Sequence, residues 1–182
     1  FSGALTGASG SLLGASGMMT KVYFPRLIIP MAPVMSKLID FGIAFVILLL
    51  MMAYFGFMPS IQIIYLPLLI LIMMITASGM GMWLTAMAVK YRDINYAMSF
   101  FVQLLMYAAP VVYPASIIPE PFRLIYGCFP MVGVIEGFRS ILLKTNPMPW
   151  DLIGVGSIVA CFLFISGAFY FRRMEKYFAD VA

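Results

Sequence analysis

The chain lacks histidine and is poor in charge and in cysteine. Its 182 residues include 11 Lys and Arg, 7 Asp and Glu, 2 Cys and no His. Without histidine, neither a Ser-His-Asp nor a Cys-His nucleophile can form, and the commonest zinc ligand is missing. Cys128 and Cys161 lie too far apart in the sequence for a metal-binding spacing. We therefore expect no catalytic residue, no metal site and no nucleic-acid partner.

A nucleotide-binding loop is also missing, although the first part of the chain is rich in glycine. A P-loop places Gly-Lys-Ser/Thr at its end, whereas Met18, Met19 and Thr20 follow Gly17. We expect no cofactor on this chain. The glycines instead recur at a spacing that lets membrane helices approach closely, within the chain or between two copies. These Gly-x-x-x-Gly pairs are Gly3 with Gly7, Gly10 with Gly14, and Gly133 with Gly137.

Long apolar runs occupy most of the sequence. Hydrophobic residues make up 64% of the chain and charged residues 10%, against about 45–50% and about 25% in soluble domains. Helices of roughly 20 apolar residues cross a bilayer and satisfy their own backbone groups there. The runs do not alternate as barrel strands do. The sequence therefore predicts an all-α integral membrane protein, a polytopic helix bundle. The uncharged runs cover residues 41–58, 61–89, 94–119 and 152–171.

Basic residues indicate the orientation of the predicted spans. Residues 21–37, 90–92 and 172–176 together hold eight of the 11 Lys and Arg. Cytoplasmic loops carry an excess of these residues, so we place the three groups on the cytoplasmic side of a single transmembrane domain. The predicted spans are residues 34–57, 61–89, 94–113 and 152–171. Residues 1–19 begin with Phe and carry no charge, and we interpret them as the tail of a span whose beginning is missing.

The segment 114–150 would lie on the outer side, yet it is too apolar for an ordinary solvated loop. Its prolines divide it into pieces too short to span, which favours a re-entrant or interfacial helical hairpin. We predict two short helices, at about residues 120–128 and 132–143. Glu136 and Arg139 are spaced to pair on one face of the second helix. Two interpretations remain open, an outer gate and an interfacial cap without a gating role.

One short basic break separates the first two apolar stretches. Residues 20–33 combine Lys21 and Arg26 with the aromatic residues Tyr23 and Phe24. Pro25, Pro30 and Pro33 are expected to prevent a continuous helix through it. On pattern alone, the break is either an ordinary positive-inside loop with aromatic anchors or a contact point for a cytoplasmic partner.

Several motifs resemble type-2 ABC transporter permeases that export O-antigen, capsule or teichoic-acid polymers. The similarity runs in order through essentially the whole chain. Two departures are visible. The beginning typical of that family is absent, and Phe129 stands where the family often has an Asn that could cap the following helix. The similar segments are residues 20–30, 89–93, 100–103, 110–114, 131–139 and 169–181.

The resemblance implies a mechanism. Two copies of the permease would form a channel in the bacterial cytoplasmic membrane, among membrane lipids, and each would bind a separate ABC ATPase that holds ATP and Mg²⁺. A lipid-linked glycan or polyol-phosphate polymer would be the substrate. Residues 20–33 would contact the ATPase and are called the coupling element below. The residues implied in ATPase coupling are Lys21, Tyr23, Phe24, Pro25, Arg26, Arg92 and Asp93. Those implied in the channel or gate are Tyr107, Pro110, Tyr113, Phe122, Tyr126, Glu136 and Arg139.

Two other functions stay open at this point. The first is an ABC permease that exports a drug or a simple lipid. The second, from a different class, is a membrane-embedded lipid or glycan transferase. The absence of histidine and of clustered acidic residues argues against the transferase.

Overall fold

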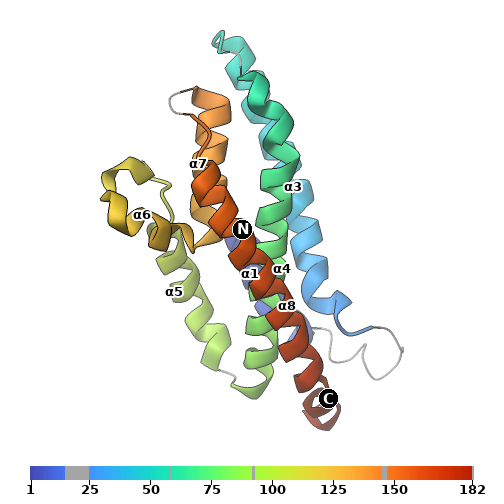
Figure 1. Cartoon of the computed structure of the whole chain (residues 1–182). Coiled ribbons are helices and arrows are strands. Elements are labelled where there is room, and N and C mark those ends of the chain that lie inside the picture. The colour runs from blue at the N-terminus through green and yellow to red at the C-terminus, as the bar shows by residue number, and fades with distance from the viewer. Residues whose placement is uncertain (15–24, 58, 92, 145–146, 182) are drawn as a thin grey trace. The chain divides into compact units, whose positions relative to one another are not determined.

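The computed structural model describes residues 1–14, 25–57, 59–91, 93–144 and 147–181, and every regular element in these ranges is helical (Figure 1). This confirms the predicted all-α class. The α-helices are α1 (Ser2–Gly14), α3 (Ile28–Tyr54), α4 (Leu66–Lys90), α5 (Asp93–Ala108), α6 (Glu120–Gly127), α7 (Pro130–Leu143) and α8 (Trp150–Val181). The short 3-10 helices are η1 (Ile61–Tyr65) and η2 (Ala115–Ile117).

Helices long and apolar enough to cross a membrane are present where the sequence predicts most of its spans. Among the described residues there are three, Ile28–Tyr54, Ile61–Lys90 and Trp150–Glu175. The pair α6 and α7 passes the same test together but is bent by 107° at a short break, so a fourth is counted if the pair is one span. The two short helices predicted in this segment are confirmed.

The helix predicted over residues 94–113 is shorter than expected. Helix α5 ends at Ala108 and has 16 residues, which corresponds to a rise of about 24 Å. Pro110 explains the early end. The residue before a proline is disfavoured in the α conformation, so Ala109 leaves the helix. Residues 109–114 therefore form a non-helical loop between α5 and η2.

Pro30 and Pro33 do not interrupt the chain as predicted, because α3 begins at Ile28 and includes both. Pro30 is the third residue of the helix, where an amide would have no intrahelical acceptor, so its missing N–H removes nothing. Pro33 removes only one bond, in the first turns. The break lies before Ile28, whose amide bonds to the carbonyl of Pro25 at 3.1 Å.

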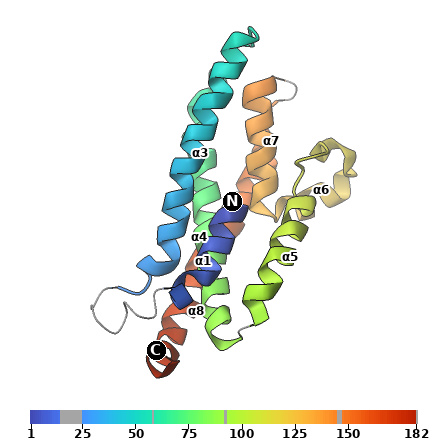
Figure 2. The same cartoon turned by 180° about the vertical axis from the view of Figure 1, so that it is seen from behind.

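Two compact units make up the chain, and each is described by itself. Unit 1 comprises Phe1–Lys37, Met74–Met106 and Cys161–Ala182. Within it, α1 packs on α4 (Figure 2). The buried Thr85 hydroxyl donates to the carbonyl of Ala8 at 2.7 Å, and a Cβ added to Gly81 would lie 2.9 Å from the Ala8 side chain. Small residues thus let the two backbones approach.

Helices α4 and α8 make a still closer contact in unit 1. A Cβ added to Gly79 would lie 2.6 Å from the Phe164 backbone nitrogen, and one added to Gly167 would lie 2.5 Å from the Gly79 carbonyl. No residue larger than glycine fits this crossing without a backbone shift. The Gly-x-x-x-Gly spacing did not reveal it, although Ser78, Gly79 and Gly81 are a cluster of small residues in an otherwise Met-rich helix.

Helix α7 is the buried element of unit 2, which comprises Leu38–Met73 and Tyr107–Ala160. A Cβ on Gly133 would lie 2.8 Å from the Leu152 carbonyl, and one on Gly137 would lie 2.8 Å from the Leu69 side chain. The predicted close packing of this glycine pair is therefore found within the chain. By contrast, Gly10 and Gly14 in α1 face open space.

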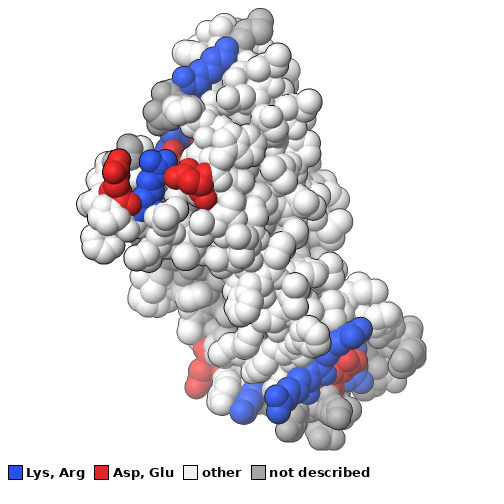
Figure 3. All heavy atoms as spheres, in the orientation of Figure 1, with Lys and Arg blue, Asp and Glu red and all other residues white. Residues whose placement is uncertain are grey.

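The surface of the chain is largely apolar. Figure 3 shows a mostly uncharged face on which the charged side chains gather in a few small groups. In α3, only 6% of the most apolar stretch is buried within the chain, and Ile39 and Leu50 are 68% and 66% exposed. Such a surface is stable in contact with lipid or another protein rather than with water.

Candidate functional site

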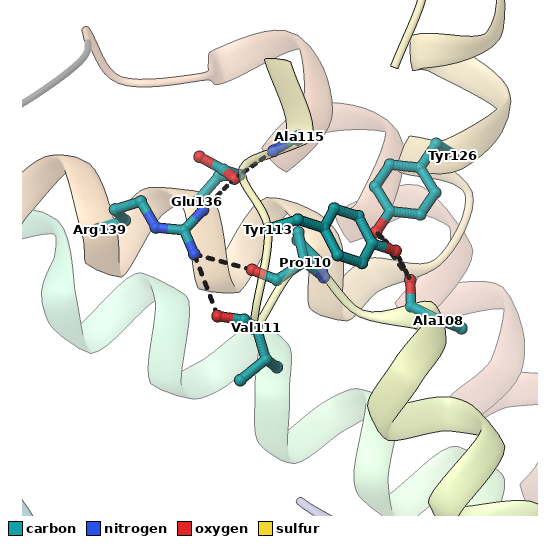
Figure 4. A network of polar contacts seen from close by, with 8 residues as sticks. All are labelled: Ala108, Pro110, Val111, Tyr113, Ala115, Tyr126, Glu136 and Arg139. Atoms are coloured by element: carbon teal, nitrogen blue, oxygen red, sulfur yellow. Dashed lines mark hydrogen bonds and ion pairs between the residues drawn. The ribbon is translucent and has the colours of Figure 1, made fainter. Parts of the chain in front are cut away.

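Polar side chains converge where α5 ends and the α6–α7 hairpin begins (Figure 4). This cluster, here called the hairpin network, lies entirely in unit 2. It joins the last turn of α5, the loop 109–114, the first residue of η2, and one face each of α6 and α7. Its members are Tyr107, Ala108, Pro110, Val111, Tyr113, Ala115, Tyr126, Glu136 and Arg139.

Two tyrosine hydroxyls cap the end of α5. The Tyr126 hydroxyl donates to the carbonyl of Ala108 at 2.7 Å. It also lies 3.1 Å from the Tyr113 hydroxyl, which in turn is 3.2 Å from the carbonyl of Tyr107. The last four carbonyls of a helix lack intrahelical partners, and in an apolar setting each unsatisfied carbonyl is costly. The tyrosines therefore replace the backbone bonds that Pro110 prevents.

An ion pair holds the loop that follows. Arg139 Nη1 lies 2.5 Å from Glu136 Oε1, which confirms the predicted pair. Arg139 Nη2 donates to the carbonyl of Pro110 at 2.9 Å, and Glu136 Oε1 accepts from the amide of Ala115 at 2.7 Å. The Glu136 side chain is only 9% exposed. A buried carboxylate is tolerated when it is paired and hydrogen-bonded, and both conditions hold here.

The network fixes the non-helical loop against α7. The planar guanidinium can serve the carboxylate and the loop carbonyls at once, which a lysine ammonium does less well. The Pro110 residue is buried in this arrangement. Four of the residues predicted for the channel or gate take part with their side chains, namely Tyr113, Tyr126, Glu136 and Arg139. Two others, Tyr107 and Pro110, take part with their backbone carbonyls.

Two predicted residues are placed differently. Tyr107 contributes only its carbonyl to the network, and its side chain is 60% exposed. Phe122, on α6, is 59% exposed and is not part of the network. Sequence reasoning also missed three members, Ala108, Val111 and Ala115. They act through backbone groups, and a backbone donor or acceptor carries no signal in the side-chain pattern.

A second ion pair fastens the hairpin to the start of α8. Arg123 Nε on α6 lies 3.6 Å from Asp151 Oδ2 on α8. Trp150 directly precedes Asp151, and its ring meets that of Tyr65 edge to face with centroids 4.9 Å apart. The two charged side chains are 42% and 46% exposed, so this pair contributes less than the buried one.

The residues predicted for ATPase coupling are only partly described. Lys21, Tyr23, Phe24 and Arg92 lie outside the described residues. Pro25 and Arg26 precede α3, and the Arg26 guanidinium contacts Glu175 of α8. Asp93 is the first residue of α5, where a carboxylate is favoured by the helix dipole.

Neither metal nor disulfide chemistry is indicated in the part of the chain that the structure describes. No group of three or more His, Cys, Asp or Glu residues there could hold a metal ion. Cys128 and Cys161 are both free thiols. The polar groups that do converge, in the hairpin network, are engaged in holding backbone, so the arrangement is suited to fixing a conformation.

Comparisons with known proteins show which proteins this chain is similar to. The profile of a family described as ABC-2 type transporter matches residues 1–143. An O-antigen export system permease protein RfbA of Klebsiella pneumoniae is 22% identical over 182 residues, which is 100% of this chain and 70% of that protein. A protein of the same name from Myxococcus xanthus is 23% identical over 180 residues, 97% of this chain and 69% of its own length.

Proposed function

We propose that this chain, which belongs to the ABC-2 type transporter family, is the membrane subunit of an exporter for a lipid-linked polysaccharide or polyol-phosphate polymer. As a member of that family it is a multi-pass transport subunit of the bacterial cytoplasmic membrane, and ATP hydrolysis belongs to a separate ABC ATPase. The observation that carries the proposal is the match, over at least 97% of the chain, to permeases named for O-antigen export.

The proposed assembly has two copies of the permease and two ATPase subunits. The coupling element, with Arg92 and Asp93 after the next span, would contact the ATPase. Basic and aromatic side chains next to a span suit a protein contact at the membrane surface. Closure of the ATPase pair on ATP would displace this element and thereby the helices that follow it, among them α3, which begins within it.

The hairpin network would hold the outer end of the path. Its bonds fix the loop 109–114 between α5 and α7, so opening a path there requires breaking the buried Glu136–Arg139 pair or moving the whole loop with it. This favours the gate over a passive cap. The exposed rings of Tyr107 and Phe122 would offer apolar faces on which sugar rings can stack.

Depletion of the full-length protein tests the proposal. Cells would be analysed for glycans linked to polyprenyl lipid on the cytoplasmic side and for polymer at the surface. We expect the lipid-linked polymer to accumulate and the surface polymer to disappear, and re-expression of the wild-type protein to reverse both changes. Normal levels of both would contradict glycan export and favour a permease for a drug or a simple lipid.

A matched control separates transport from transferase chemistry. The same analysis would be made in cells whose partner ATPase carries an inactivated ATP site. A transporter predicts the same accumulation in these cells, because transport needs ATP hydrolysis. Polymer synthesis or transfer by the purified permease without any ATPase would instead support a membrane transferase.

A further inference from the structure

Arg26 is the one described cation of the coupling element that precedes α3, and it contacts another part of the same chain. Its Nη1 donates to the backbone carbonyl of Glu175 at 2.9 Å. Its Nε lies 3.7 Å from the Glu175 carboxylate. The two residues are 149 positions apart in the sequence. The guanidinium therefore joins the coupling element to the last helix through a hydrogen bond to the backbone and an ion pair with a side chain.

The residues beside this contact are packed on a common core within unit 1. Phe171, one turn before Glu175, is fully buried in a cluster with Met82 and Ile29. Leu27, next to Arg26, and Met174, next to Glu175, both pack against that cluster. Exposed ion pairs by themselves are weak. Here the apolar contacts on either side bring the two charged groups together and limit their motion.

Helix α8 is in turn fixed to α4. The Trp83 indole donates to the Ser166 hydroxyl at 3.1 Å, and its ring stacks on Tyr170 with centroids 4.2 Å apart. The Gly79–Gly167 crossing lies within a turn or two of these contacts. The segment of α8 that carries Glu175 is therefore held to α4 by a hydrogen bond, a ring stack and a backbone crossing.

We propose that Arg26 and Glu175 are positioning residues that make the coupling element and the end of α8 move as one body. Arg26 then acts inward, on α8, rather than as a contact of the ATPase. A displacement of the coupling element is delivered to α8, and through Trp83 and Gly79 to α4. This inference rests on the proposed function for its consequence in transport, although the contact itself is testable in the isolated permease.

Charge reversal in the full-length complex tests the proposal. Arg26→Glu and Glu175→Arg each break the side-chain pair and place like charges together. We expect each to lower the amount of polymer exported per ATP hydrolysed by about 2- to 5-fold, the range set by a partly exposed pair. The ATPase should still co-purify at the wild-type level. The doubly reversed variant should recover most of the lost coupling. Arg173→Glu, at an exposed position of the same helix, is the matched control and should change none of these quantities.

Three outcomes would overturn the proposal. The first is that Arg26→Glu loses ATPase co-purification and that adding Glu175→Arg to the same chain does not restore it, because Arg26 would then bind the ATPase directly. Another is wild-type coupling in Glu175→Arg. The third is measured by thermal unfolding of the purified permease without ATPase. The effects of the two reversals on stability should be non-additive if the two residues are in contact, and strict additivity would contradict the contact. This last measurement stands even if polymer export itself proves wrong.

Discussion

Removal of Arg139 should destabilise the permease more than removal of any surface charge. The Glu136 side chain is only 9% exposed in the intact chain. In Arg139→Ala its carboxylate loses the guanidinium and keeps the hydrogen bond from the amide of Ala115 at 2.7 Å. The carbonyl of Pro110 also loses its donor. Removing one partner of a buried ion pair costs about 3–5 kcal/mol. Since the Arg139 side chain is 21% exposed, we expect a loss at the lower end, about 3 kcal/mol.

Two further variants separate charge from geometry. Arg139→Lys keeps the charge, but an ammonium serves the Glu136 carboxylate and the loop carbonyls together less well than the planar guanidinium does. It should lose about one charged hydrogen bond, roughly 1.5–3 kcal/mol. The pair of changes Glu136→Gln and Arg139→Gln removes the stranded charge together with its partner. The double variant should lose less free energy of unfolding than the sum of the losses in Glu136→Gln and Arg139→Gln, by about 1–3 kcal/mol.

The assay is the free energy of unfolding of the purified full-length permease in mixed micelles, titrated with a denaturing detergent. Arg123→Ala serves as the control, because its pair with Asp151 has both side chains more than 40% exposed, at 42% and 46%. It should cost about 0–1 kcal/mol. A loss below about 1 kcal/mol in Arg139→Ala, or strict additivity in the double variant, would show that the Glu136–Arg139 pair does not stabilise the fold as a buried ion pair.

Two other substitutions probe features that the structure brings together. Tyr126→Phe removes the donor to the Ala108 carbonyl and should cost about 1 kcal/mol in the same assay; an unchanged free energy of unfolding would mean that this hydroxyl does not cap α5. Gly167→Ala places a methyl group against the Gly79 carbonyl and should cost about 1–3 kcal/mol. Gly154→Ala, on the same helix where the added carbon meets nothing within 4 Å, should be neutral or slightly stabilising, and equal effects at the two positions would contradict the close crossing.

Helix positions were largely predictable from the sequence because they depend on local properties. The uncharged runs predicted membrane-spanning helices, and the structure has such helices at Ile28–Tyr54, Ile61–Lys90 and Trp150–Glu175. The prolines of the hairpin separated two short helices that the structure contains as α6 and α7. The errors were also local. Pro30 falls in a first turn that tolerates it, and Pro110 ended α5 earlier than the uncharged run suggested.

The candidate site was predictable only in part. The spacing of Glu136 and Arg139 on one helix indicated their pair, because residues three apart share a face. The same spacing said nothing about the third and fourth partners, the carbonyl of Pro110 and the amide of Ala115. Those groups are present in every residue, and which of them lacks a partner depends on where the helix before them ends.

The amino-acid sequence was enough to identify a helical membrane protein and to locate most of its helices, because apolar length and charge are properties of contiguous residues. The three-dimensional structure was needed to show that Gly79 meets Gly167, that Tyr126 caps α5, and that Arg26 contacts Glu175. Each of these contacts joins different elements of the fold, through residues 18 to 149 positions apart in the sequence. In an environment without a hydrophobic driving force between helices, such contacts depend on close fit and on satisfying backbone groups, which no local pattern records.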